Sequence, residues 1–491
     1  MPPPIVTATQ EDAGTADGSL PEKQKVEQWI FTQEFYHGFI PRQDVSSILT
    51  KHGDFLVRST ETTYTTKTNQ TRRRISPIIC VLLDPENQYA NATDSARLEM
   101  VRNLIIHSKS GKIFLDPKLK FDSAEEMFQH YMKTSFTINN KEINLTRGIG
   151  LTDWEFEHKN VKVGKVIGRG QFGEVRRGKL TLKNGGVAYV AIKSIKTDAD
   201  ISKELIKAVM KEARLMRGLN HPNVVKLYGV GMLDQPLYIL LEYVAGGALK
   251  TYLRKNKDTI TKPEKIQMAL GAGWGIGYLH KSNIIHRDIA ARNCLYDHDS
   301  AVKISDFGLS RVGTEYKMKT ATKMPVRWMA PESILNFMFT RKSDVYSYGV
   351  LIYEIFTSKD PYSDVQTGTV KKRIIEGELN TFPSGTPEDL VAYVKEKMWC
   401  KDPDKREDMD KICSWLEVYA GLNAVSFVEE SMELPKAPSL VQPKSMVSTV
   451  GAPKSAAERR KLQVFKKLRK QNKSYENRPD LAHSQDHGEA A

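Results

Sequence analysis

The octet HRDIAARN, residues 286–293, decides how the fold of this 491-residue chain is interpreted. It places His286, Arg287, Asp288, Arg292 and Asn293 around two alanines, between apolar runs that are typical of a protein core. An aspartate in a loop most often forms a turn, so the octet alone leaves a turn and a reactive site equally open. The segments before and after it are needed to choose between them.

The composition limits the classes of protein. With 40% hydrophobic residues the chain can form two or three sizeable domain cores. The sequence predicts no membrane span, because it contains no run of about 18 apolar residues. It predicts no signal peptide, because MPPPIVTATQ lacks a charged start followed by an apolar block. Four cysteines without metal-like spacing favour a reducing, cytoplasmic compartment. The net charge of +14 predicts an anionic partner but does not choose among nucleic acid, lipid headgroups and phosphorylated protein.

Changes in composition divide the chain into five segments. Residues 1–25 lack an apolar period and residues 430–491 are polar and basic, so both are predicted to be disordered. Between them we expect a small α+β domain, a linker, and a larger domain that begins with strands and is mainly helical from about residue 203. These three segments are 29–145, 146–160 and 161–422.

In the small domain the short apolar runs predict a central antiparallel sheet flanked by two helices. One helix is expected after Pro41 and the other at 123–132. The polar and basic segment 60–74 is predicted to be a long hairpin connection between two strands.

Three glycines of IGRGQFGEV, residues 167–175, have G-x-G-x-x-G spacing: Gly168, Gly170 and Gly173. Glycines in this pattern let backbone amides approach phosphate oxygens. A dinucleotide fold would need a helix directly after the glycines. Here they are followed by a KNGG turn at 183–186 and by VAIK at 190–193, which predict a hairpin and a strand.

The glycine loop, VAIK, HRDIAARN, DFG at 306–308, APE at 330–332 and SDVYSYG at 343–349 occur in this order. The ordered set resembles the protein kinase family and covers residues 161–422. The resemblance implies a bilobal kinase domain that uses ATP and Mg²⁺.

The same resemblance assigns roles to individual residues. Lys193 would hold the α- and β-phosphates and pair with Glu212, Asn293 and Asp306 would bind Mg²⁺, and Asp288 would orient or accept the proton of the attacking hydroxyl. Without the other motifs, Lys193 would be an ordinary exposed lysine. The nucleotide-binding residues implied by the family are Ile167, Gly168, Gly170, Gln171, Phe172, Gly173, Val175, Ala191, Lys193, Glu242 and Val244.

Two segments predict tyrosine as the substrate. Serine/threonine kinases usually carry a lysine where Ala290 stands, whereas the cation here comes at Arg292, an arrangement that resembles tyrosine kinases. A tyrosine hydroxyl lies farther from its backbone than a serine hydroxyl, which is consistent with this shift of the cation. Pro325 with the following Val-Arg-Trp resembles the tyrosine-kinase substrate platform. Tyr316, between DFG and APE, is the expected autophosphorylation site, with its phosphate near Arg287.

In the first domain, HGDFLVRST at 52–60 alternates so that Arg58 shares a face with Leu56. A half-buried arginine needs a partner, and an internal salt bridge is the simpler interpretation from this strand alone. The segments FYHGFIPRQD at 35–44, FLVRST and FDSAEEMFQHY together resemble the SH2 domain over residues 29–145. In that family Arg58 binds the phosphate of phosphotyrosine, with Arg42 and Thr60 assisting. Asn103 stands where many such domains carry histidine.

An SH2 domain directly before a tyrosine kinase most resembles the non-receptor Fes/Fer group. The expected partners are tyrosine-phosphorylated proteins and protein substrates. Residues 458–473 form either a basic helix for an acidic membrane surface or a solvated tail, so we expect a cytoplasmic protein with peripheral plasma-membrane binding as an alternative. A catalytically dead adaptor is disfavoured because the motif residues are all present, and a nucleic-acid binder because no recognisable module occurs.

Overall fold

The computed structural model describes residues 28–65, 71–86, 93–138, 140–170, 173–195, 203–297, 301–319 and 324–421. The segments 1–25 and 430–491, which the sequence predicts to be disordered, lie outside these residues. The chain forms two compact units, and each is described by itself. The first comprises Met1–Ala213 and Tyr228–Leu240, and the second comprises Arg214–Leu227 and Leu241–Ala491.

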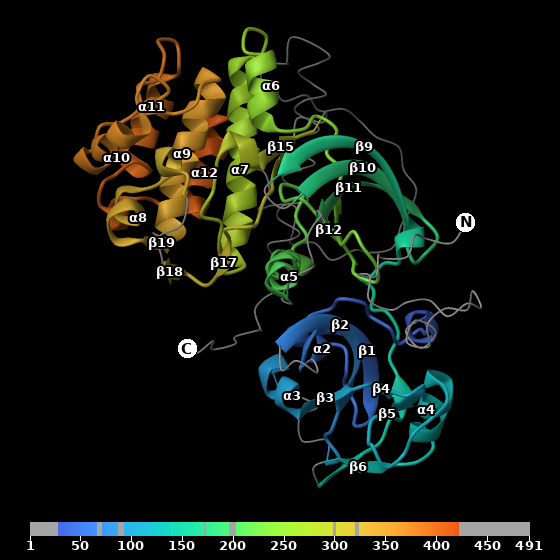
Figure 1. Ribbon diagram of the computed structural model, residues 1–491. Helices are drawn as coiled ribbons and strands as arrows, with labels where there is room; N and C mark the ends of the chain where they lie inside the picture. Colours follow the sequence, from blue (N-terminus) through green and yellow to red (C-terminus); the bar gives the residue numbers. More distant parts are fainter. Residues whose placement is uncertain are drawn as a thin grey trace, which may run out of the picture. The chain divides into compact units, whose positions relative to one another are not determined.

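The first part of the first unit has the α+β organisation predicted for residues 29–145 (Figure 1). Its helices are α2 (Arg42–Val45), α3 (Asp94–Met100) and α4 (Ala124–Tyr131). Its strands are β1 (Asp54–Thr65), β2 (Thr71–Leu82), β3 (Val101–Ile105), β4 (His107–Lys109), β5 (Lys112–Phe114), β6 (Phe136–Ile138), β7 (Lys141–Ile143) and β8 (Arg147–Gly148).

The central sheet has the strand order β3-β2-β1-β8. β1, β2 and β3 are antiparallel, and the short β8 is parallel to β1. Since successive side chains of a strand point to opposite faces, Phe55 and Val57 enter one apolar core together with Met127 and Phe128 of α4. Arg58 belongs to the opposite face of β1.

Two local predictions for this domain need correction. The segment 60–74 is not mainly a connection, because β1 continues to Thr65 and β2 begins at Thr71 with Thr65 paired to Thr71. A third helix, α3, was not predicted. It begins after Thr93, whose hydroxyl accepts a hydrogen bond from the amide of Ala96 at 3.3 Å. None of its residues is buried, so it lacks the apolar periodicity on which sequence prediction depends.

The rest of the first unit is built on a five-stranded sheet of order β12-β13-β11-β10-β9. Its elements are η1 (His158–Asn160), β9 (Val161–Gly170), β10 (Gly173–Thr181), β11 (Val187–Ile195), α5 (Lys203–Arg217), β12 (Leu227–Gly231) and β13 (Tyr238–Glu242). The predicted KNGG turn is confirmed: the amide of Gly185 donates to the carbonyl of Leu182 at 2.9 Å. Gly185 has φ +82, which glycine adopts easily.

Within this unit, the segment that opens the first domain contacts the five-stranded sheet directly. The amide of Phe39 donates to the carbonyl of Met232 at 2.9 Å. Gly38 has φ +60, and a Cβ built on it would lie 2.0 Å from that same carbonyl oxygen, so this close approach requires glycine. The buried His37 also contacts the linker, because its Nδ1 lies 2.8 Å from Oε1 of Glu155.

The second unit is mainly helical, as predicted. Its helices are α6 (Leu249–Lys255), α7 (Lys262–Lys281), α8 (Pro331–Asn336), α9 (Arg341–Thr357), α10 (Thr367–Glu376), α11 (Glu388–Lys397) and α12 (Met409–Tyr419). The short strands and 3-10 turns are β14 (Ile284–Ile285), η2 (Ala291–Asn293), β15 (Cys294–Tyr296), β16 (Val302–Ile304), β17 (Arg311–Val312), β18 (Glu315–Lys317), η3 (Val326–Trp328), β19 (Met338–Thr340) and η4 (Pro403–Lys405).

Helix α7 lies against α9 and α12 in the core of the second unit (Figure 1). It begins at a capping box in which Thr261 and Glu264 satisfy each other's backbone amides. Every residue from Met268 to His280 is buried, which fits a helix surrounded by other elements rather than a surface helix. In the part of the chain that the structure describes, no helix is long and apolar enough to cross a membrane.

Candidate functional site

The first unit carries the predicted Lys193–Glu212 pair. Lys193 lies on β11, and its Nζ donates to both carboxylate oxygens of Glu212 on α5, at 2.9 and 2.7 Å. Glu212 is 7% exposed, so little of the charge of this carboxylate is screened by water. Ile167, Val175 and Ala191 of the neighbouring strands remain partly exposed. Gln171 and Phe172 lie outside the described residues.

In the second unit, Asp344 of α9 holds the start of the HRDIAARN loop. Its two carboxylate oxygens accept the amides of His286 at 2.8 Å and of Arg287 at 2.9 Å. Arg287 has φ +69, an uncommon conformation for a residue with a side chain. The buried carboxylate therefore stabilises a backbone conformation that the loop would rarely adopt alone.

Asp288, Arg292 and Trp328 form one cluster. The guanidinium of Arg292 donates through Nη2 to Oδ1 of Asp288, and its centre lies 4.1 Å from the centre of the Trp328 ring. Arg292 is therefore fixed by an ion pair and by a cation–π contact. This cluster brings together the two segments from which the sequence predicts a tyrosine substrate.

Asn293 and Asp306 offer oxygen atoms of the kind that Mg²⁺ prefers. The Nδ2 of Asn293 donates to the carbonyl of Asp288 at 2.8 Å, which leaves its Oδ1 as the acceptor. Asp306 is exposed and has φ +61, and no cation pairs with it among the described residues. The neighbouring Phe307 is buried in the core, where it packs against His286 with ring centroids 5.3 Å apart.

Sequence reasoning missed Glu354, a buried carboxylate of α9. Its Oε2 accepts the amide of Ala291 at 2.8 Å and the indole Nε1–H of Trp328 at 2.9 Å. It thus connects the HRDIAARN loop to the segment that carries the predicted substrate platform. Burial raises the pKa of Glu354 to about 7, although the two donated hydrogen bonds act in the opposite direction. A glutamate inside an apolar run, as in VLIYEIF, was the available sequence signal.

Tyr316, the predicted autophosphorylation site, lies on β18, which pairs with β19. Its ring centre is 4.5 Å from the guanidinium of Arg287 and 5.0 Å from that of Arg311. Burial and the charge of Arg311 lower the pKa of Arg287 to about 10. Two cations beside one tyrosine ring are suited to receive a phosphate there.

Glu242 and Val244, which are predicted to bind the nucleotide, also lie in the second unit. The amide of Glu242 donates to the carbonyl of Lys226 at 2.8 Å, and its side chain pairs with Lys303 at 2.9 Å. Val244 is buried. Glu332 and Arg406 form a two-bond ion pair in this unit, with Nη1 and Nη2 of Arg406 at 2.7 and 2.8 Å from the two carboxylate oxygens.

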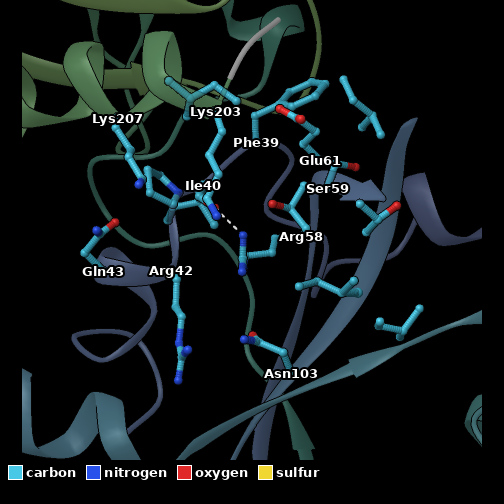
Figure 2. A pocket seen from close by; sticks show the side chains of 17 residues that line it. Phe39, Ile40, Arg42, Gln43, Arg58, Ser59, Glu61, Asn103, Lys203 and Lys207 are labelled. Atoms are coloured by element: carbon cyan, nitrogen blue, oxygen red, sulfur yellow. Dashed lines mark hydrogen bonds between the residues drawn. The ribbon is translucent and has the colours of Figure 1, made fainter. Parts of the chain in front are cut away.

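Arg58 lies in a cavity of the first unit and is 6% exposed. Its Nε lies 3.3 Å from Sγ of Cys80, and its Nη1 lies 3.5 Å from the carbonyl of Ile40. No carboxylate forms an ion pair with it among the described residues, so the internal salt bridge considered from the sequence is not found there. Figure 2 shows its guanidinium within the cavity. A buried guanidinium without a carboxylate is costly, which favours an external anion as its partner.

The other predicted phosphotyrosine-binding residues line the same cavity. Thr60 lies two residues after Arg58 on β1, and Asn103 enters from β3. Arg42 begins α2 and points away from Arg58 (Figure 2), with Nη2 at 3.5 and 3.4 Å from the carbonyls of Leu98 and Val101. These contacts are long for hydrogen bonds, so they hold the Arg42 side chain only weakly.

The raised pKa of Glu354 predicts how stability depends on pH. Between its unfolded value of about 4.5 and its folded value of about 7, the folded state holds a proton that the unfolded state has lost. The free energy of unfolding should therefore fall as pH rises through this window, by about 3 kcal/mol at most, and level off above it. Glu354→Gln should resemble the parent at pH 5 and exceed it in stability at pH 8, as measured by thermal unfolding.

His221 has the opposite effect on the pH dependence of stability, because burial lowers its pKa to about 3. It contributes equally to the parent and to Glu354→Gln, so the difference between the two proteins reports on Glu354. Glu388→Gln, at an exposed position of α11, is the control and should follow the pH profile of the parent. Parallel profiles for the parent and Glu354→Gln would show that the proton on Glu354 does not affect folding.

Comparisons with known proteins cover both parts of the site. The family described as protein tyrosine and serine/threonine kinase matches residues 161–416. The SH2 domain family matches residues 35–131. The first match contains the Lys193–Glu212 pair and the catalytic loop, and the second contains Arg42, Arg58 and Thr60.

Similar proteins cover most of this chain. Fer-related kinase 1 of Caenorhabditis elegans is 33% identical over 404 residues, which are 81% of this chain and 97% of that protein. The tyrosine-protein kinase transforming protein Fps of an avian sarcoma virus (strain PRCII) is 33% identical and covers 79% of this chain and 67% of its own length. Tyrosine-protein kinase Fer of Homo sapiens is 31% identical over 79% of this chain and 44% of its own length. This chain therefore belongs to the family of non-receptor tyrosine kinases in which an SH2 domain precedes the kinase domain, as in the Fer and Fps kinases.

Proposed function

We propose that this tyrosine kinase transfers the γ-phosphoryl group of Mg²⁺-bound ATP to tyrosine. Asp288 would accept a hydrogen bond from the tyrosine hydroxyl, and Arg292 would form one wall of the substrate site. The use of ATP follows from the kinase family. The observation that supports the proposal most directly is Arg292, held between the carboxylate of Asp288 and the Trp328 ring. A tyrosine hydroxyl lies farther from its backbone than a serine hydroxyl, which is consistent with a wall beside the carboxylate.

The residues of the chain contribute mainly placement and charge, which supply most of the rate in phosphoryl transfer. Asp288 would accept a hydrogen bond from the tyrosine hydroxyl and orient it for in-line attack. Lys193, fixed by Glu212, would bind phosphate oxygens of ATP. Asn293 and Asp306 would hold Mg²⁺, which when bound offsets the negative charge of the phosphates. Mg²⁺ sites of this kind rely on one or two protein ligands plus phosphate, which fits the oxygen donors present.

The glycine loop is consistent with phosphate binding, because protein packing does not require two of its glycines, Gly168 and Gly170. A Cβ built on Gly170 would meet nothing within 4 Å, and one on Gly168 would meet only Cβ of Val175, at 3.8 Å. Gly178 on the same hairpin is different, since its Cβ would lie 2.3 Å from Ile192 and 2.7 Å from the carbonyl of Lys162. Packing thus explains the glycine at 178 and leaves Gly168 and Gly170 to be explained by a ligand that approaches the backbone.

Gly170→Ala should raise KM for ATP several-fold, because the added Cβ would meet the bound phosphates. It should leave the thermal midpoint within about 2 °C of the parent, because the Cβ would meet no described protein atom within 4 Å. Gly178→Ala is the matched control and should lower the midpoint by several degrees, because the new Cβ displaces packed atoms. Peptide-kinase assays across an ATP series, together with thermal unfolding, separate the two effects. A fall in stability for Gly170→Ala with no change in KM would contradict a phosphate-binding role.

The transfer reaction should require Asp288 and Arg292. With ATP and Mg²⁺, the purified protein should phosphorylate a Glu-Tyr copolymer and itself on tyrosine, including Tyr316, as detected by phosphoamino-acid analysis and mass spectrometry. Asp288→Asn should lower turnover by about 10²-fold or more, the usual contribution of a general base. Arg292→Met should also reduce it, whereas Arg254→Met on the surface of α6 should not. Phosphoserine as the main product would overturn the proposed role of Arg292.

The SH2 domain supplies the second activity, binding of tyrosine-phosphorylated proteins. We propose that Arg58 binds the phosphate with two hydrogen bonds and that Thr60 donates a third, since both line the same cavity. Arg42 would join them after leaving its weak carbonyl contacts.

A cytoplasmic location is proposed from the cysteines, as it was from the sequence: the four cysteines form no disulfide among the described residues, which suits a reducing compartment.

The basic segment 458–473, which lies outside the described residues, is proposed to bind acidic membrane surfaces. If it does, full-length protein should bind liposomes that contain acidic lipid, the binding should weaken as salt is raised, and deletion after Ser455 should abolish it. Sedimentation with liposomes measures the bound fraction. Equal binding to neutral liposomes would exclude an electrostatic attachment and favour a solvated tail.

A further inference from the structure

The cavity that contains Arg58 is lined by residues of the SH2 domain and by residues of helix α5. It has a volume of about 350 Å³ and is formed on one side by residues of the SH2 domain. On the other side it is closed by the first turns of helix α5 in the kinase domain, through Lys203, Ile206 and Lys207. Figure 2 shows the two lysine side chains extending from α5 toward Ile40, on the wall opposite Asn103. All of these residues belong to the first compact unit.

Lys203 and Lys207 occupy neighbouring positions on one face of α5, because residues four apart in a helix lie one turn from each other. Both are exposed, while Ile206 beside them is 8% exposed. Neither lysine forms an ion pair with a carboxylate in the described ranges. Two like charges on one helix face are mildly unfavourable without an anion, so packing of the protein alone does not account for the pair.

The charges around the cavity exceed what phosphotyrosine can neutralise. Among the described lining residues, four side chains are cationic, Arg42, Arg58, Lys203 and Lys207, and one is a carboxylate, Glu61. A phosphotyrosine carries about 1.5 to 2 negative charges at pH 7. Once Arg58 and Arg42 have bound that phosphate, the two lysines still lack an anion.

We infer that helix α5 completes the phosphotyrosine site, and that Lys203 and Lys207 form a second, anion-binding subsite that selects peptides with an acidic residue or a second phosphate next to the phosphotyrosine. The inference rests on the proposed function of Arg58 in phosphotyrosine binding. The kinase domain then contributes directly to the choice of ligand by the SH2 domain. An isolated SH2 domain would lack this part of the specificity.

The walls of the cavity favour a peptide over a lipid headgroup. Ile75 and Ile105 line it and are 37% and 47% exposed, so they offer apolar surface to an aromatic ring. A phenyl ring buried against them gains hydrophobic stabilisation, whereas an inositol ring would lose hydrogen bonds of its hydroxyls to water. The ligand that fits is therefore a phosphorylated tyrosine with negative charge beside it.

The test compares two phosphotyrosine peptides that differ only in the residues flanking the phosphotyrosine, which are glutamates in one and glutamines in the other. Full-length protein should bind the glutamate peptide about tenfold more tightly at low salt in isothermal titration calorimetry. Lys203→Ala with Lys207→Ala should reduce this preference to less than twofold and leave the affinity for the glutamine peptide unchanged. Salt should weaken the preference in the parent, because it screens the exposed lysines.

Controls separate this inference from the proposed SH2 function. Lys371→Ala with Lys395→Ala removes two exposed lysines from α10 and α11 and should keep the tenfold preference. Arg58→Leu should lose both peptides, and if it does not, the proposed SH2 function and the inference fail together. If Arg58→Leu loses both peptides but the α5 variant keeps the preference, the second subsite alone is overturned. The second subsite for peptides is also overturned if the α5 variant loses binding only to phosphoinositide vesicles, because the lysines would then bind a lipid headgroup.

Discussion

Two buried carboxylates of helix α9 support the catalytic loop on which the kinase chemistry depends. Asp344 accepts the amides of His286 and Arg287, and Glu354 accepts the amide of Ala291 together with the indole of Trp328. The loop between these anchors contains Asp288. A short loop with an unfavourable dihedral angle keeps one conformation only when surrounding groups compensate the strain, and these carboxylates do so through amides that would otherwise be buried without partners.

The two carboxylates differ in their hydrogen-bonding surroundings. Asp344 is 1% exposed, yet it accepts two backbone amides and lies 3.1 Å from Nε2 of His280. Glu354 accepts two hydrogen bonds on the same oxygen, and burial raises its pKa to about 7. Neutral or charged, it can hold Trp328 beside Arg292. Helix α9 thus anchors both the catalytic loop and Trp328 of the substrate wall through hydrogen bonds.

The SH2 cavity follows a different physical logic. A guanidinium that is 6% exposed without a carboxylate reduces the stability of the folded protein unless an anion binds. Arg58 instead contacts Cys80 and the carbonyl of Ile40, both of which are uncharged. Burial also raises the pKa of the Cys80 thiol, so the sulfur beside Arg58 remains neutral. The site is therefore prepared for an external anion, and the lysines of α5 extend the same positive charge beyond it.

The sequence by itself determined the kinase and SH2 assignments, because phosphate binding and phosphoryl transfer need particular residue types at fixed local spacing, as in HRDIAARN and FLVRST. It also predicted the KNGG turn, where glycine permits a positive φ. It did not predict α3, which buries no residue, or the full length of β1 and β2, whose polar ends resemble a loop. Only the tertiary structure decided that Glu354 contacts Trp328, that no carboxylate among the described residues pairs with Arg58, and that Lys203 and Lys207 line the SH2 cavity. These contacts join residues 26 to about 150 positions apart, and their geometry depends on how the whole chain packs.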